Sequence, residues 1–301
     1  MKKILVIGSI NIDIVISADH FALPGQTILG RGLKKVPGGK GFNQAIACGK
    51  LGADVSMVGC VGNDADGKAC LNYLDENSID GKDIEIVDTN TGTAIITVCN
   101  GENTIVLDRG ANDYCTSELI EKNVKSILEA DIIVLQYEIP METIKYILEI
   151  ANREDKFVVL NPAPYMYLEE EYLKYIDLIV LNETEAEGLT GKDFSDIENA
   201  KTNIFDILKF GIESVIITLG KNGCVYNLAG EIIHKEAYKV RVVDTTSAGD
   251  SFIGGLCTTL SDGKSFSEAI DYATKVSAIT VTREGSSISI PTKDEVESLE
   301  L

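Results

Sequence analysis

Short runs of apolar, β-branched residues alternate along this chain with longer amphipathic stretches, and this alternation constrains the fold more than any other feature. The apolar runs lie at Ile4–Ile7, Val55–Val61, Ile132–Leu135, Phe157–Leu160, Leu178–Leu181 and Val215–Leu219. Helical periodicity is found between them, at Asn43–Leu51, Ser117–Leu128, Met141–Ala151 and Ile197–Phe210. Strands without a polar face, separated by helices, are typical of a parallel sheet that helices cover on both sides. The sequence therefore predicts a three-layer α/β/α fold with a central, mostly parallel sheet.

Two regions depart from this alternation. The segments Thr93–Cys99 and Thr104–Leu107 flank Asn100-Gly101, a dipeptide that favours the type I′ turn of a β-hairpin. Ile12–Ile16 and Gly25–Gly39 also have β character and follow no helix. We therefore expect a small antiparallel β-sheet, built from about residues 12–37 and 92–110, that can serve as a lid. Because no linker or repeat divides the remainder, residues 1–301 are expected to form a single domain.

The charge of the chain narrows the class of partner. Lys and Arg number 27 against 47 Asp and Glu, which gives a formal net charge of −20. This balance argues against nucleic acid or an anionic membrane surface as a partner, since both require basic patches. No apolar run approaches the roughly 20 residues that span a bilayer, and the apolar start at Ile4–Ile7 is too short for a signal peptide. Seven scattered cysteines without a CxxC pair argue against a zinc cluster or a disulfide framework and favour a cytoplasmic protein with reduced thiols.

One segment nearly fits the phosphate-binding pattern GxxxxGK[ST], at Gly62–Ala69. Ala69 stands where that pattern requires a hydroxyl for Mg²⁺, and Asp64 and Asp66 would face the phosphates. We interpret it as a turn that leads into a helix.

The segment Asp-Thr-Thr-Ser-Ala-Gly-Asp at 244–250 carries more information. The small residues Ser247, Ala248 and Gly249 allow successive backbone amides to converge on an anion at a helix N-terminus. A carboxylate beside such a site, here Asp250, is suited to act as a general base that takes a proton from an attacking hydroxyl. The alternative is that Asp250 only caps the helix. On this segment alone both interpretations remain open.

A second Gly-rich turn, Gly-Gly-Lys-Gly-Phe-Asn-Gln-Ala at 38–45, opens another helix. With three further motifs, these two segments resemble the ribokinase (PfkB-type) family of carbohydrate kinases, in the family's order and from Gly8 to Pro291. The further motifs are Gly8–Asp13, Asn161–Pro164 and Asn182–Glu185, and Gly110–Asn112, Thr218–Gly220 and Val281–Gly285 add to the resemblance. It implies a ribokinase-like fold with a β-sheet lid and ATP-dependent phosphorylation of a sugar, D-ribose at its 5-hydroxyl being the leading expectation.

The resemblance also implies a role for individual residues. Asp250 is similar to the family's catalytic base, and the amides of Ser247, Ala248 and Gly249 to its anion hole. The expected sugar ligands are Asn11, Asp13, Gly39, Lys40, Asn43 and Glu138, beside Asp250 itself. The expected ATP contacts are Asn182, Thr218, Gly220, Gly223, Ala248, Gly249 and Thr274. For Glu138 the alternative is a surface carboxylate, and for Thr274 it is core packing.

Two metal ions enter through the same resemblance. Glu185, in the Asn-x-x-Glu motif that begins at Asn182, is expected to act on Mg²⁺ through water, although this spacing is also that of a helix capping box. A monovalent cation, K⁺, is expected beside the anion hole. Its implied ligands are Asp244, Thr246, Thr280, Arg283, Gly285 and Ser289, of which all but Asp244 and Ser289 would use backbone carbonyls.

Departures from the family pattern bear on the identity of the substrate. Phe42 replaces a common Ala, and Ser247 and Gly255 also differ from the usual residues. If the ring of Phe42 faces the sugar it reshapes the pocket, and if it packs into the core substrate choice is unaffected. Asn11 favours ribose over its 2-deoxy analogue. The alternatives are a related kinase for a nucleoside or another sugar and a non-catalytic sugar-binding paralogue. The resemblance further implies a homodimer that pairs through the lid.

Overall fold

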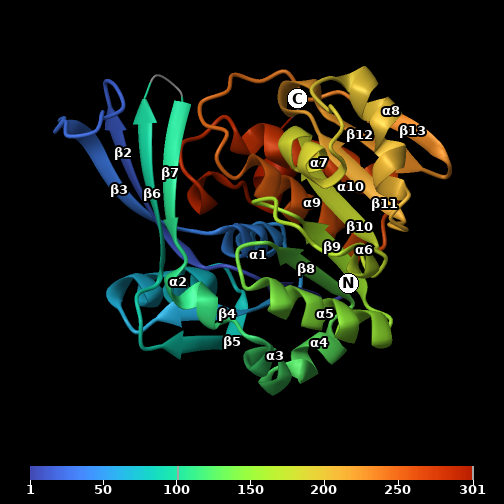
Figure 1. Ribbon diagram of the computed structural model, residues 1–301, viewed down its shortest axis with the longest axis horizontal. Helices are drawn as coiled ribbons and strands as arrows, with labels where there is room; N and C mark the ends of the chain where they lie inside the picture. The colour runs from blue at the N-terminus through green and yellow to red at the C-terminus, as the bar shows by residue number, and fades with distance from the viewer. Residues whose placement is uncertain (100–101, 300–301) are drawn as a thin grey trace.

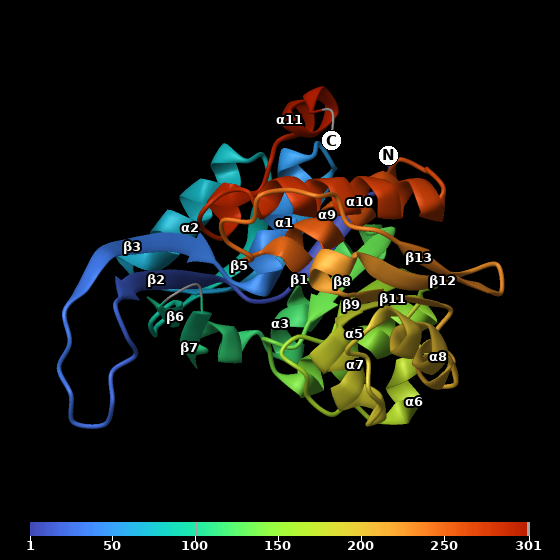
Figure 2. The same ribbon diagram turned by 90° about the horizontal axis from the view of Figure 1, so that it is seen from above.

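The computed structural model describes residues 1–99 and 102–299, and its helices pack on both faces of a nine-stranded sheet (Figures 1 and 2). One face is covered by α1 (Lys40–Lys50), α2 (Ala65–Glu76), α9 (Ala248–Ser261) and α10 (Phe266–Thr280), outside which lies α11 (Lys293–Ser298). The helices of the opposite face are α3 (Ser117–Lys122), α4 (Val124–Glu129), α5 (Met141–Arg153), α6 (Glu170–Leu173), α7 (Glu183–Thr190) and α8 (Ile197–Leu208). The expected three-layer α/β/α fold is confirmed.

The large sheet has the strand order β13-β12-β11-β10-β9-β8-β1-β4-β5. Its parallel part, from β5 to β11, contains the six predicted runs and one strand that the sequence did not single out, β5. The bounds are β1 (Ile4–Ile7), β4 (Val55–Gly62), β5 (Asp80–Val87), β8 (Ile132–Gln136), β9 (Phe157–Asn161), β10 (Leu178–Asn182) and β11 (Ser214–Thr218). At one edge, β12 (Cys224–Leu228) and β13 (Glu231–Lys235) are antiparallel.

Both faces of the central strands are buried. In β1, Leu5 and Ile7 belong to the apolar cluster under one helical layer, whereas Ile4 and Val6 belong to the cluster under the other. Successive side chains of a strand point to opposite faces, so a strand between two helical layers must be apolar at every position. This is why the six central runs could be recognised without any alternation of polar residues.

One predicted helix is divided in the structure. Instead of a single helix over Ser117–Leu128, α3 ends at Lys122 and α4 begins at Val124. Between them, the side-chain Nδ2 of Asn123 donates to the carbonyl of Leu119 at 3.1 Å. Asn side chains compete in this way with the backbone for helical carbonyls, and the helix is interrupted at that residue.

The small sheet has the order β3-β2-β6-β7, and it extends away from the body beside α2 (Figure 1). Its strands are β2 (Asn11–Ala18), β3 (Gly30–Gly38), β6 (Gly92–Cys99) and β7 (Glu102–Asp108). Residues 25–29 of the expected β segment lie outside β3, and the predicted Asn100-Gly101 turn falls outside the described residues. The function of this sheet as a lid, and the assignment of residues 1–301 to one domain, stay predictions.

The small sheet was expected to be antiparallel throughout, and the structure shows that it is not. β3 pairs antiparallel with β2, and β7 with β6, but β2 and β6 are parallel. The two hairpins join through their first strands, and both of these strands leave the body in the same direction. Local turn signals identify each hairpin but carry no information about how two hairpins pair, so the sequence could not reveal this.

The Gly62–Ala69 segment is a turn into a helix, as interpreted. The Asp64 carboxylate accepts from the backbone N–H of Gly67 at 2.7 Å and so caps α2.

All seven cysteines lie among the described residues, buried and outside any disulfide. Over residues 1–99 and 102–299, no helix combines the length and the apolar character that crossing a bilayer requires.

Candidate functional site

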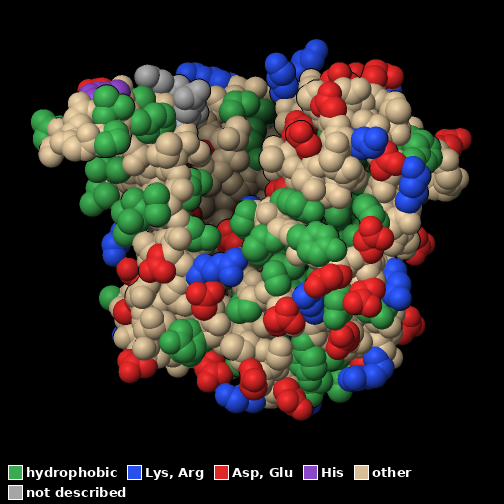
Figure 3. All heavy atoms as spheres, viewed as in Figure 1, with side chains coloured by type: hydrophobic (Ala, Val, Ile, Leu, Met, Phe, Trp, Pro, Cys, Tyr) green, Lys and Arg blue, Asp and Glu red, His purple; other side chains and the backbone are tan. Residues whose placement is uncertain are grey.

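Four neighbouring strands of the parallel sheet each end, at the carboxyl end, in a polar residue. Gln136 ends β8, Asn161 ends β9, Asn182 ends β10 and Thr218 ends β11. In open α/β sheets, ligands bind outside this edge of the sheet. The surface has a hollow between the small sheet and the body (Figure 3). The predicted site residues gather along this edge and at the helix starts beside it.

Asp250 lies in the first turn of α9 and is buried, with 7% of its surface exposed. Its Oδ2 accepts from Nδ2 of Asn43 at 3.2 Å, and its Oδ1 accepts from Nε2 of Gln44 at 3.0 Å. Both donors come from the Gly-rich turn and helix α1, more than 200 residues away in the chain. The interpretation of Asp250 as a helix cap is wrong, because the cap residue is Ser247 and the Asp250 carboxylate bonds to another helix.

The backbone before Asp250 presents free amides. Ser247 has the left-handed conformation, with φ of 60°, and the helix begins at Ala248. The amide of Ala248 donates to the carbonyl of Thr245 at 3.2 Å. Among the described residues, no protein acceptor engages the amides of Ser247, Gly249 and Asp250. A methyl group added at Gly249 would contact no atom within 4 Å, so this turn opens onto free space. Successive unpartnered amides at a helix start form an anion-binding nest.

The Gly-rich turn holds the start of α1 against the loop after β1. Gly39 caps α1 with φ of 93°. A Cβ atom at Gly41 would lie 2.7 Å from backbone atoms of Gly8 and Ser9, closer than real Cβ contacts come. The amide of Gly41 also faces the Ser9 hydroxyl, at 3.3 Å. Glycine at position 41 is therefore required by close backbone approach.

Lys40 brings a positive charge into a group of carboxylates. Burial of its side chain acts to lower the pKa of Lys40, but the carboxylates of Asp250, Glu138 and Glu185 outweigh it and raise that pKa. The ammonium group therefore stays protonated in the site. These three carboxylates come from different segments of the chain and all act on Lys40. The predicted base, sugar and metal residues therefore lie close to one another.

Three further predicted sugar ligands are held by polar neighbours. Asn11 and Asp13 lie at the start of β2 in the small sheet, and Glu138 follows β8 of the large sheet. Oε2 of Glu138 accepts from the Ser9 hydroxyl at 2.5 Å and from the amide of Lys40 at 3.2 Å. Glu138 is thus tied to the Gly-rich turn, which favours the site over a surface role.

Asn11 and Asp13 are both buried. The side chain of Asn112 donates to Oδ1 of Asn11 at 2.7 Å, which leaves the Asn11 amide hydrogens free to donate elsewhere. Burial raises the pKa of Asp13 from 3.8 to about 6, against a hydrogen bond from Ser286, and the charges of Glu138 and Asp250 raise it further. A carboxylate with so perturbed a pKa in a cleft is typical of a functional site.

Asn182 and Glu185 form the capping box that was considered as an alternative. The Glu185 amide donates to Oδ1 of Asn182 at 2.8 Å, and the Asn182 amide donates to Oε2 of Glu185 at 2.9 Å. Burial raises the pKa of Glu185, although the amide of Asn182 and the charge of Lys40 act to lower it. No three His, Cys, Asp or Glu side chains of the described residues cluster as metal ligands. Glu185 and Asn182 offer carboxylate and amide oxygens, the type of ligand that Mg²⁺ takes in proteins, so their chemistry fits this ion.

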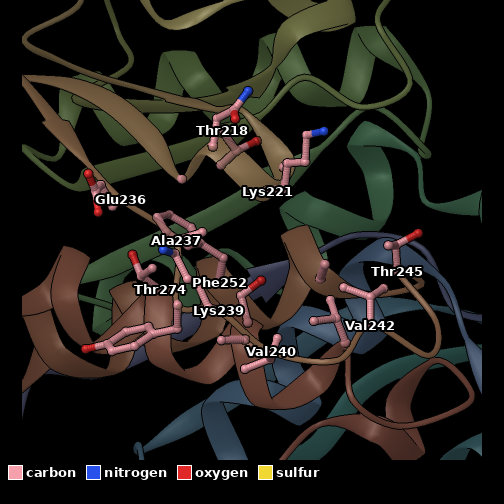
Figure 4. A pocket seen from close by; sticks show the side chains of 18 of the residues that line it. Thr218, Lys221, Glu236, Ala237, Lys239, Val240, Val242, Thr245, Phe252 and Thr274 are labelled. Atoms are coloured by element: carbon pink, nitrogen blue, oxygen red, sulfur yellow. The ribbon is translucent and has the colours of Figure 1, made fainter. Parts of the chain in front are cut away.

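A cavity of about 710 Å³ adjoins the free amides, a volume within the range of small-molecule sites. Thr218 and Lys221 lie on one side of it, and Phe252 and Thr274 lie on the other (Figure 4). Its lining includes six of the seven expected ATP contacts, namely Thr218, Gly220, Gly223, Ala248, Gly249 and Thr274. Asn182, the seventh, does not line it. The Thr274 hydroxyl donates to the carbonyl of Ile270 at 2.7 Å, so this residue is both packed and in the cavity wall.

The residues expected around K⁺ belong to two loops that bond to each other. Oδ1 of Asp244 accepts from the amide and the hydroxyl of Thr246 at 2.9 and 2.7 Å, and its Oδ2 accepts from the amide of Gly285 at 3.0 Å. The amide of Arg283 donates to the carbonyl of Thr280 at 3.1 Å, and the hydroxyl of Ser289 donates to the carbonyl of Ser286 at 2.7 Å. The ligands expected for K⁺ in this set, the Asp244 carboxylate, the Ser289 hydroxyl and backbone carbonyls, are all oxygens, the kind of ligand that a hard cation takes.

Phe42 does not face the site. Its side chain is fully buried in the apolar cluster under α1 and α9 and stacks on Tyr73, with ring centroids 6.1 Å apart. This departure from the family pattern therefore leaves the sugar pocket unchanged.

Four residues that the sequence analysis did not assign support the site, namely Ser9, Gln44, Asn112 and Gln136. All four are almost completely buried and all are uncharged. Three of them lie within motifs already noted, at 8–13, 38–45 and 110–112, and Gln136 ends a predicted strand. Besides those motifs, Gln44 and Gln136 show an amide within or directly after an apolar stretch, and buried polar residues of this kind must find partners inside the protein.

Comparisons with known proteins agree with this geometry. The family model described as pfkB family carbohydrate kinase matches residues 1–293. A curated protein named ribokinase, from Haemophilus influenzae, is 40% identical to the chain over 296 residues, covering 98% of this chain and 97% of its own.

Solved structures extend the likeness to the fold. The ribokinase of Thermotoga maritima has a TM-score of 0.89 and 39% identity, with 99% of each chain covered. A ribokinase of Arabidopsis thaliana, solved with ribose and ATP, has a TM-score of 0.91 and 28% identity, and the match covers 98% of this chain and 97% of that one.

Proposed function

Because this chain belongs to the pfkB family of carbohydrate kinases, we propose that it transfers the γ-phosphoryl group of ATP to the 5-hydroxyl of D-ribose. The observation that carries the proposal is the position of Asp250. Its carboxylate bonds to Asn43 of the Gly-rich turn, and the free amides that precede it open toward the 710 Å³ cavity. A proton acceptor between a polyol site and a nucleotide site is what phosphoryl transfer to an alcohol requires.

In the proposed reaction, Asp250 takes the proton of the 5-hydroxyl as the sugar oxygen bonds to the γ-phosphorus. The bond between that phosphorus and the bridging oxygen of ADP breaks, and its electron pair leaves with ADP. The amides of Ser247 and Gly249 stabilise negative charge on the transferred group, because they are preorganised and donate to no protein atom among the described residues. Lys40, kept protonated by its carboxylate neighbours, adds a positive charge to the same region.

Two ions complete the proposal. Mg²⁺ would be placed by Glu185 through water, where it neutralises charge on the nucleotide phosphates. A monovalent cation, K⁺, would be bound by the oxygens of Asp244, Thr246, Thr280, Arg283, Gly285 and Ser289, beside the turn that carries the free amides. The hydrogen bonds of Asp244 to Thr246 and Gly285 support a common position for this set.

Ribose is the proposed sugar for two reasons. The relatives named above are ribokinases, and one of them was solved with ribose. Asn112 also fixes the orientation of Asn11, because it bonds to the Asn11 oxygen and leaves the amide hydrogens available to a sugar hydroxyl. A buried amide that faces no hydroxyl would lose about 1–3 kcal/mol, so 2-deoxyribose should bind more weakly. A nucleoside would need a stacking surface, and Phe42 is too deeply buried to provide one.

A substrate panel tests this assignment. With ATP and Mg²⁺, we expect kcat/KM to be highest for ribose, about 10–100-fold lower for 2-deoxyribose, and negligible for fructose and inosine. Replacing the alkali ion by tetramethylammonium should lower the activity, and K⁺ should restore it. The measurement is ADP release by a coupled assay, at matched ionic strength. A strong preference for inosine would contradict the ribose assignment.

We also propose that the chain forms a homodimer through the small sheet. Ile14, Ile95 and Val106 are directly opposite one another in β2, β6 and β7, on the face turned away from Asp13. Ile95 is 51% exposed and Val106 is 69% exposed. An apolar row on a sheet with open edges is a liability unless a partner covers it.

Ile95→Asp is expected to convert a dimer into a monomer in sedimentation velocity at micromolar concentration, because it buries a charge in the proposed interface. Leu128→Asp, an exposed apolar position on α4, is the matched control and should leave the dimer intact. A wild-type protein that sediments as a monomer would contradict the proposal.

The seven buried thiols, free of disulfides, support a reducing compartment and hence a cytoplasmic location.

A further inference from the structure

Two of the three glutamines in the chain are completely buried within the candidate site. Gln44 lies on α1 and Gln136 ends β8, whereas Gln26 lies in the loop between β2 and β3. An amide side chain removed from water is unfavourable unless its donors and its acceptor are paired. The hydrogen bonds of Gln44 therefore indicate why this amide is buried, whereas Gln136 has a partner for its Nε2 but none for its Oε1 among the described residues.

Gln44 is paired at every position. Its Nε2 donates to Oδ1 of Asp250 at 3.0 Å and to Oδ1 of Asn161 at 3.3 Å, and its Oε1 accepts from Nε2 of Gln136 at 2.7 Å. Both hydrogens of the amide group and one lone pair of its oxygen are thus hydrogen-bonded within the protein. It joins α1 to the start of α9 and to the ends of β8 and β9, which lie close together in Figures 1 and 2.

The direction of this chain of hydrogen bonds is determined by its ends. An ionised Asp250 can only accept, and the Oδ1 of Asn161 faces Gln44 because the Nδ2 of Asn161 donates to the carbonyl of Val180 at 3.0 Å. Gln44 must therefore present its NH₂ group to both, which leaves its oxygen for Gln136. Rotating the Gln44 amide by 180° would oppose acceptor to acceptor and donor to donor at all three contacts.

The pairing has a consequence for Asp250. Oδ1 is held by Gln44, so the plane of the carboxylate is fixed and Oδ2 is the oxygen beside Asn43, at the sugar turn. We propose that Gln44 is a positioning residue for the reaction, which, with its oxygen bonded to Gln136, holds Oδ1 of Asp250 so that Oδ2 receives the proton of the sugar hydroxyl. This inference rests on the proposed function, in which Asp250 is the base.

A purely structural role for Gln44 makes different predictions. Loss of a buried amide alone would reduce stability and leave kcat and its pH dependence unchanged. Loss of a donor to the carboxylate removes an interaction worth about 10–100-fold in equilibrium terms and frees the carboxylate to rotate. It also disfavours the charged form of the carboxylate, so the acid limb of the kcat profile should move to higher pH.

The experiment uses unbranched, uncharged replacements of the same length. We expect Gln44→Met to lower kcat about 10–100-fold, to change the KM for ribose less than threefold, and to shift the acid limb upward. Gln136→Met should lower kcat less, about 3–10-fold, because Gln44 keeps both of its donor contacts and loses only the partner of its oxygen. Gln26→Met, the third glutamine and exposed in a loop, is the control and should match the wild type.

The double variant tests whether the two amides act as one unit. In the Gln44→Met background, Gln136→Met should cause almost no further loss of kcat, whereas independent structural roles would give losses that multiply. If Gln44→Met does not fold, Gln136→Met and the pH profile carry the test. Wild-type kcat and pH dependence in either folded variant would overturn the inference.

Asp250→Asn separates this inference from the proposed function. If that variant kept full activity, Asp250 would not be the base and the proposed mechanism would fail. If it lost activity while Gln44→Met kept the wild-type kcat, the mechanism would stand and only the positioning role of Gln44 would be wrong.

Discussion

Asp250→Asn is expected to lower kcat about 10²–10⁴-fold, the range that a positioned general base contributes. Asparagine has the same shape, but only its oxygen can accept, so it keeps the hydrogen bond from one of the two donors, Asn43 and Gln44, and it cannot take a proton at neutral pH. Sugar binding depends mainly on other side chains, so the KM for the sugar should change little. The measurement is steady-state kcat and KM with ribose and ATP.

Asp262→Asn is the matched control, because it makes the same change at the exposed C-terminal end of the same helix. This variant should keep the kcat of the wild type. Thermal melts of both proteins show whether the fold is intact. Substantial kcat in a folded Asp250→Asn protein would mean that another group removes the proton, and the proposed mechanism would have to be abandoned.

Asp13→Asn is expected to weaken sugar binding and at the same time to stabilise the free protein. An ionised Asp13 accepts hydrogen bonds from sugar hydroxyls, and bonds to a charged group contribute about 1.5–3 kcal/mol each. The variant should therefore raise the KM for ribose about 10–100-fold with a smaller change in kcat. Isothermal titration with ribose measures the loss directly, and unchanged affinity would exclude Asp13 from the sugar site.

The stability effect follows from the pKa of Asp13, which burial raises from 3.8 to about 6. Below about pH 3 the carboxyl is neutral in both the folded and the unfolded state, and its burial then costs no ionisation free energy. As the pH rises to about 6 and above, the unfolded chain loses its proton more easily, and the native state is destabilised by about 2–3 kcal/mol. Urea denaturation should show Asp13→Asn equal to the wild type at about pH 3 and more stable by about that amount at pH 7.5.

The body of the fold could be predicted because its signals are local. The six buried runs of the parallel sheet needed only their apolar, β-branched composition, and their carboxyl ends then placed Asn161, Asn182 and Thr218 along one edge. The small residues at 247–249 indicated an anion at a helix start, whereas the assignment of the 38–45 turn to the sugar came from the family resemblance. The structure brings Asn43 and Asp250 within hydrogen-bonding distance, as both assignments require.

The remaining features depend on contacts between distant segments. The parallel pairing of β2 with β6 is decided by how two hairpins meet, and no residue of either hairpin records it. The bond between Gln44 and Asp250 spans 206 residues, and the sequence shows only an amide in an apolar helix. The amide of Ala248 donates to the carbonyl of Thr245 at 3.2 Å, where the backbone is left-handed at Ser247. A serine does not indicate in the sequence that it will adopt this conformation.

The tight contact of Gly41 with Gly8 and Ser9 leaves no room for even a methyl group between the start of α1 and the loop after β1. These two segments carry Asn43 and Asn11, so the distance between two of the proposed hydroxyl contacts is set by packing of main chain on main chain. Such a frame does not adapt to sugars of other dimensions. Discrimination among substrates then resides in a stiff part of the molecule, while the projecting sheet can govern only when the sugar enters and when the product departs.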